Sequence, residues 1–92
     1  MLLDKCTLNA AVNIKFGGGA MTVYLEEAVH SVYGLSNEAD KFLPSAVKKF
    51  LIVGKQYLVT QFEAGLEEFG DFFSYSGAGL EYQANLYLRR TH

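Results

Sequence analysis

TLNAAVNIKF, residues 7–16, has an apolar side chain at every second position, and the positions between them hold Thr7, Asn9, Ala11, Asn13 and Lys15. An extended chain places every second side chain on the same face. The apolar face of this stretch holds Leu8, Ala10, Val12, Ile14 and Phe16. The pattern predicts a half-buried strand, and the run Gly17–Gly19 that follows allows the backbone to turn.

LEYQANLYLR, residues 80–89, shows the same alternation near the other end of the sequence. Its inward face is predicted to hold Leu80, Tyr82, Ala84, Leu86 and Leu88. The preceding Ser76-Gly77-Ala78-Gly79 is typical of a turn. Two long strands with one polar face each therefore frame the domain.

The segment between Gly19 and Gly34 favours a helix. Thr22 is a candidate N-cap, Glu26 and Glu27 lie near the predicted positive end, and Gly34 is a stop signal. The predicted apolar stripe, spaced by three and four residues, consists of Met21, Leu25, Ala28, Val29 and Val32. On such a helix His30 would pair with Glu26 one turn earlier.

A second helical stretch is predicted from residues 36–37 to Leu43, with a kink or break at Pro44. Helical spacing resumes at Ala46 and continues to Gly54, which is expected to end the helix. A competing interpretation makes 47–53 a strand that forms a hairpin through residues 54–55. We prefer the helix because Lys48-Lys49 interrupts strand alternation.

Residues 56–63 are rich in β-branched and aromatic side chains and predict a strand, whereas 64–73 fit either a helical turn or a strand. The expected fold class is α+β, with an antiparallel sheet of three to four strands and two helices packed on one face. The expected element order is then strand, two helices, strand, the unassigned segment 64–73 and strand. We expect the ninety-two residues to form a single domain, 1–92.

Composition narrows the functional class. Half of the residues are apolar, the formal net charge is −2 and Cys6 is the only cysteine. We expect no intramolecular disulfide, no membrane span and no autonomous nucleic-acid binding. The first residues show no basic region followed by an apolar stretch, so we expect no secretory signal and a cytoplasmic protein.

Candidate chemical motifs are weak. The Gly17–Gly19 turn before a predicted helix resembles a phosphate-binding loop, but no Gly-Lys-Ser/Thr follows it. Cys6, His30 and the carboxylates lack the spacing of a metal site, and no nucleophile is placed beside a base. We therefore predict no catalytic residues, no metal and no cofactor, with His30 on the surface and Cys6 as a small core residue.

Charged and aromatic residues are the more informative features. Residues 63–81 carry five acids and no base, and four lysines fall within 41–55. Tyr and Arg dominate binding hot spots, and opposed charge clusters suit a docking surface. The predicted partner-binding residues are Lys41, Lys48, Lys49, Lys55, Glu67, Glu68, Asp71, Tyr87, Arg89 and Arg90.

In size, acidity and general character the chain resembles the small phage-encoded anti-CRISPR proteins, and among them the inhibitors of the type I-F surveillance complex. The resemblance implies a stoichiometric inhibitor in the cytoplasm of the host bacterial cell. Such a protein docks on Cas proteins of the surveillance complex and obstructs target-DNA binding or nuclease recruitment. The resemblance also allows contacts to the guide RNA of the complex. The members of this group share no sequence signature from which site residues can be transferred.

The leading functional hypothesis is thus a non-enzymatic protein-interaction inhibitor that acts as a monomer or weak dimer. One alternative is a small structural or assembly subunit, phage or antitoxin-like, with its aromatic patch as an oligomer interface. Another is an anion- or nucleotide-binding module that uses the Gly17–Gly19 turn.

Overall fold

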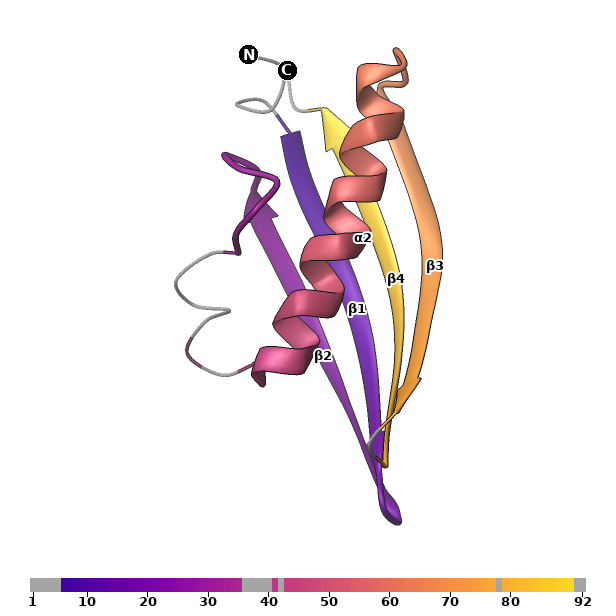
Figure 1. Ribbon diagram of the computed structural model, residues 1–92. Coiled ribbons are helices and arrows are strands. Elements are labelled where there is room, and N and C mark those ends of the chain that lie inside the picture. Colours follow the sequence, from indigo (N-terminus) through magenta and orange to yellow (C-terminus); the bar gives the residue numbers. More distant parts are fainter. Residues whose placement is uncertain (1–5, 36–40, 42, 78, 91–92) are drawn as a thin grey trace.

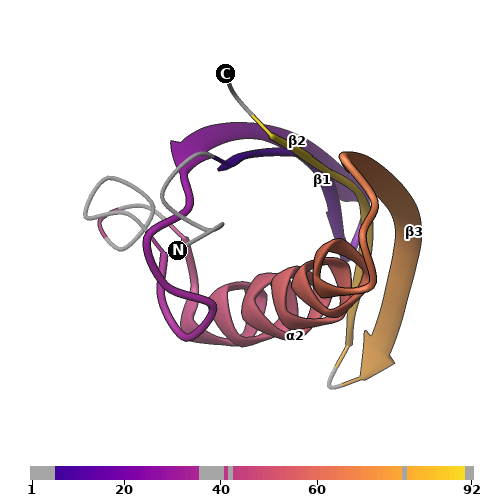
Figure 2. The ribbon, with the colours of Figure 1, turned by 90° about the horizontal axis from the view of Figure 1, so that it is seen from above.

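The computed structural model describes residues 6–35, 41, 43–77 and 79–90. They form an α+β unit with the element order β1 (Cys6–Phe16), β2 (Gly19–Ala28), α2 (Ser45–Glu63), β3 (Glu68–Gly77) and β4 (Leu80–Arg90). The strands make one antiparallel sheet in the order β2-β1-β4-β3. The helix crosses one face of the sheet, and the sheet curves around it (Figures 1 and 2).

The two alternating segments are strands, as the sequence predicts, and they form the centre of the sheet. β1 and β4 pair along their length, with Leu8 opposite Leu88 and Val12 opposite Ala84. Their inward side chains are buried against the helix, apart from the partly buried Leu80. Phe16 departs from the prediction, because it lies at the end of β1, beyond the helix, and is 48% exposed.

The predicted helix over residues 20–33 is wrong: this segment begins with β2, which forms a hairpin with β1. Gly17 and Gly18 make the turn, and Gly17 has a φ of 57°, which a residue without Cβ adopts easily. The inward positions of β2 include Leu25 and Glu27, both buried. The buried Glu27 interrupts the apolar alternation that would identify a strand. The remaining apolar residues are spaced by three and four only by chance, and this spacing led to the helix prediction.

The helix α2 is longer than predicted. It begins directly after Pro44 and runs through Gly54 to Glu63, so the helix preferred for 47–53 is confirmed and the strand predicted for 56–63 is wrong. Gly54 is not a stop signal. A Cβ there would overlap Leu86 Cδ1, so this glycine allows the helix to approach β4 closely.

The open segment 64–73 divides at Glu68, where β3 begins. β3 is an edge strand, and its inward aromatic side chains contact α2. The ring of Tyr57 lies edge-on to Phe69 and Phe73, with centroid distances of 5.9 and 5.7 Å. The dense aromatic stretch of the sequence is therefore the strand that lines one side of the helix.

The described residues contain one helix rather than the two predicted. The helical stretch predicted from residues 36–37 to Leu43 lies largely outside the described residues, which include only Lys41 and Leu43 of its second half. Leu43 is buried in the core next to Pro44. No helix in the described part of the chain combines the length and hydropathy needed to cross a bilayer.

One ion pair is buried beneath the helix. Lys55 Nζ lies 3.3 Å from Glu27 Oε1, and the two side chains are 2% and 5% exposed. The same ammonium donates to the carbonyl oxygen of Gly34, beyond β2. Lys55 thus joins α2 to β2 and to the segment that follows it, which is why a charged residue is found in the core.

Candidate functional site

The face of the sheet opposite the helix carries the candidate binding surface. Because α2 covers only one face (Figure 2), the outward side chains of all four strands lie on the other, convex face. We call this surface the open face. The antiparallel register aligns its residues in rows that run across the four strands.

Three rows make up the middle of the open face. The central row contains Tyr24, Ala11, Asn85 and Phe72 in neighbouring strands, followed toward one end of the sheet by a row of Glu26, Asn9, Tyr87 and Gly70. On the other side of the central row lie Thr22, Asn13, Gln83 and Ser74. Glu26 is the only charged residue in these twelve positions, so the middle is polar and aromatic but nearly neutral.

The small side chain of Ala11 leaves a hollow in the central row. An open depression of about 360 Å³ surrounds it, bounded by Asn9, Tyr24, Glu26, Asn85 and Tyr87. Tyr24 is 78% exposed and Tyr87 is 37% exposed, so aromatic surface borders the hollow without being covered by the fold. A protruding side chain of a partner can enter such a hollow between aromatic and amide groups.

Hydrogen bonds hold several of these side chains in place. Thr22 Oγ1 donates to Asn13 Oδ1 at 2.7 Å, and Asn9 Nδ2 donates to Glu26 Oε2 at 3.5 Å. The Tyr87 hydroxyl donates to the Glu68 carboxylate. This last bond raises the pKa of Tyr87, with smaller contributions from desolvation and from the negative charge of Glu68.

Gly70 explains how Tyr87 reaches Glu68. Gly70 lies opposite Tyr87 in the register, and a Cβ at Gly70 would be 3.0 Å from Tyr87 Cδ2. The ring therefore lies across a position with no side chain and extends to the carboxylate next to it on β3. The shape of this part of the open face depends on a glycine that sequence reasoning did not single out.

The predicted partner-binding residues divide between regions. Glu68, Tyr87 and Arg89 lie on the open face, with Arg89 opposite Glu68. Arg90 points to the other face, where its guanidinium lies 5.8 Å from the centroid of the Phe62 ring. The adjacent arginines therefore do not act as one basic patch, because neighbours in a strand point in opposite directions.

The lysines and the remaining acids lie elsewhere. Lys48 and Lys49 are on α2, Lys41 is exposed before it, Glu67 is exposed ahead of β3, and Asp71 lies on the helix side of β3. The prediction that Lys55 contacts a partner is corrected. Lys55 is 1% exposed and forms an ion pair with Glu27, so a partner cannot reach it in this structure. Helical spacing alone could have placed Lys55 on the buried side of α2, had the helix been extended past Gly54.

The chemical candidates are also rearranged. The Gly17–Gly19 turn precedes a strand, so the helix N-terminus that an anion-binding loop requires is missing there. The pairing of His30 with Glu26 was predicted on a helix, but Glu26 lies in a strand. His30 follows that strand and is exposed. Cys6 is buried as expected, and desolvation raises the pKa of its thiol above its ordinary value.

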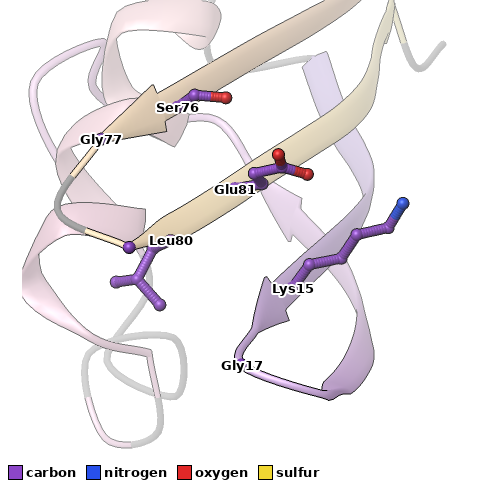
Figure 3. A pocket seen from close by; sticks show the side chains of 7 residues that line it. Lys15, Gly17, Ser76, Gly77, Leu80 and Glu81 are labelled. Atoms are coloured by element: carbon purple, nitrogen blue, oxygen red, sulfur yellow. The ribbon is translucent and has the colours of Figure 1, made fainter.

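A second open pocket, of about 420 Å³, lies where the two hairpins end. Figure 3 shows Lys15, Gly17, Ser76, Gly77 and Glu81 around it, with Leu80 pointing away from Lys15. One lysine beside one glutamate gives it no net charge. Among the described residues, no group of three His, Cys, Asp or Glu side chains is placed to hold a metal ion.

Comparison of the chain with protein-family models, curated proteins and solved structures gave no match.

Proposed function

We propose that this protein is a non-enzymatic binding protein that docks on its partner through the open face of its sheet. The observation that carries the proposal is the hollow at Ala11, which the exposed rings of Tyr24 and Tyr87 border. Protein interfaces share this anatomy, in which charge is depleted at the centre and Tyr and Phe are enriched. The stronger charges of the open face lie toward its ends, at Lys15 and Glu81 and at Arg89 and Glu68.

The scaffold favours tight binding because the side chains are held before the partner arrives. They project from paired strands rather than from loops, and the bonds of Tyr87 to Glu68 and of Thr22 to Asn13 restrict two of them further. Ordering a mobile side chain on binding costs about 0.5–1.5 kcal/mol, and a side chain held in advance avoids much of that cost. The open face thus supports stoichiometric docking without turnover.

For the target, we propose a Cas subunit of a type I surveillance complex in the bacterial cytoplasm, with occlusion of target DNA as the inhibitory step. This part rests on the resemblance in size and acidity to type I-F inhibitors. Tyr87, Glu68 and Arg89 are then the contact residues among those predicted from the sequence. Lys48 and Lys49 belong to α2, on the opposite side of the sheet, and one docking event through the open face leaves them uncovered.

The test uses purified protein and a purified type I-F surveillance complex, with co-elution and target-DNA mobility shift as readouts. The unaltered protein should co-elute and reduce DNA binding. Ala11→Arg fills the hollow and Tyr24→Ala removes one wall, so each should weaken binding at least about tenfold, or about 1.4 kcal/mol.

The matched control is Thr60→Arg, which adds the same side chain to an exposed position of α2 and should bind normally. Equal binding by Ala11→Arg and the unaltered protein would contradict the open face as the docking site. No binding of the unaltered protein to the complex would contradict the proposed target.

A further inference from the structure

The outer edge of β3 is a second candidate surface. β3 is an edge strand, so the backbone N–H and C=O groups on this side form no hydrogen bonds within the sheet. Arg90 N donates to Glu67 O at 3.0 Å, which fixes the residues of β3 whose backbone faces β4. Alternate residues of an antiparallel strand direct both N–H and C=O to the same side. The backbone groups that face away from β4 therefore belong to Glu68, Gly70, Phe72, Ser74 and Ser76.

This edge has few of the features that normally prevent strands from pairing. β3 spans ten residues, EFGDFFSYSG, with no lysine, arginine or proline. Natural edge strands are usually short, interrupted or basic, because a long free edge is a template for another strand. At this edge the Asp71 carboxylate accepts a hydrogen bond from the Phe72 N–H at 2.7 Å, so a local side chain holds that amide.

The helix leaves an apolar flank above the same edge. Val53 is 63% exposed and Tyr57 is 42% exposed on the side of α2 that faces β3. Near the start of the helix, Phe50, Val53 and Tyr75 border a groove of about 330 Å³ together with Ala46 and Lys49. A strand added beside β3 would pass under this flank and cover it.

We propose that the free edge of β3 pairs antiparallel with β3 of a second copy of this chain, which joins two sheets into one of eight strands. The charges select this occupant. Lys49 and Tyr75 both line the groove, and Asp71 lies earlier on β3, on the same face as Tyr75. A twofold axis at Phe73 places Asp71 of each copy opposite Tyr75 of the other, within reach of its Lys49.

The register is also compatible with the rest of the strand. It keeps outward residues outward and places no acidic residue of β3 directly opposite another. The Phe72 amide would exchange the Asp71 carboxylate for the backbone of the second copy, and the released carboxylate would pair with Lys49. The edge contact leaves both open faces exposed, so this assembly is independent of the proposed docking and would present two binding surfaces.

Sedimentation equilibrium across a wide concentration range tests the pairing, and circular dichroism checks the fold of every variant. The unaltered protein should show a monomer–dimer equilibrium. Ser74→Pro removes an edge-facing N–H that the monomer does not use in its sheet, so it should remain folded and lose the dimer. A protein that stays monomeric at every concentration, or a dimer that Ser74→Pro leaves intact, would overturn the proposal.

Charge exchange tests the register. Lys49→Asp and Asp71→Lys should each raise the dimer dissociation constant at least about tenfold, and the double variant should restore it. Lys15→Asp, the same change on the open face, is the control and should leave the constant unchanged. Failure of the double variant to recover would overturn the assigned register even if Ser74→Pro abolishes the dimer.

Discussion

The two faces of the sheet are built from the same four strands, yet they respond to different constraints. On the helix side, apolar side chains and one buried ion pair fill the space between α2 and the sheet. On the open face, Tyr24, Asn85 and Tyr87 border a hollow that the fold does not fill. A change on the helix side should therefore alter stability first, and a change on the open face should alter binding first.

The largest expected effect is on the buried ion pair. Lys55→Met removes the ammonium that Glu27 contacts, and breaking a buried pair in this way costs about 3–5 kcal/mol, a large share of the stability of a small domain. Thermal or urea unfolding monitored by circular dichroism measures the loss. Replacing both partners, Glu27→Leu with Lys55→Met, should recover most of it, because neither charge then remains in the core. A double variant no more stable than Lys55→Met would mean that the pair matters for more than charge compensation.

A smaller effect is expected where the helix approaches the sheet. Gly54→Ala places a methyl group against Leu86, and overpacking of this kind costs about 1–3 kcal/mol, although alanine favours helices. Urea denaturation should show a lower midpoint. Gly18→Ala is the matched control, because nothing lies within 4 Å of a Cβ built there. Equal midpoints for the two variants would show that Leu86 moves aside freely.

The smallest effect concerns the open face and its pH dependence. Glu68 raises the pKa of Tyr87, so the neutral phenol is favoured in the folded protein. The stabilisation from this bond is complete below the ordinary pKa of tyrosine and is lost as the pH rises through the raised value. Tyrosinate absorbance, compared between the unaltered protein and Tyr87→Phe, isolates this group. Glu68→Gln should lower the pKa of Tyr87, and an unchanged titration would show that the bond is not formed in solution.

Local pattern was sufficient for the strands in the middle of the sheet. β1 and β4 have neighbours on both sides and a core on one face, so their residues alternate without interruption. The local pattern was misleading for β2, where Glu27 occupies an inward position, and for α2, where Gly54 lies inside the helix. In both cases a residue that looks like an interruption is explained by a group distant in sequence, Lys55 for Glu27 and Leu86 for Gly54.

The proposed docking surface shows the same division. Residue type alone singles out Tyr87, Arg89 and Glu68, all of which lie on the open face, because Tyr and Arg are common in interfaces and Glu68 belongs to an acidic run. Ala11, Tyr24 and Asn85 were missed, since none of them is distinctive until the register brings them together from three strands. Conversely, Lys55 has the right residue type for a docking surface and lies in the core.

The sequence by itself determined that this is a small α+β domain with two long amphipathic strands, because a period of two in side-chain polarity is a local property of an extended chain. Only the tertiary structure decided which segments pair, which charges are buried and where the hollow of the open face forms. These depend on contacts between residues far apart in the chain, and a local pattern does not specify such contacts.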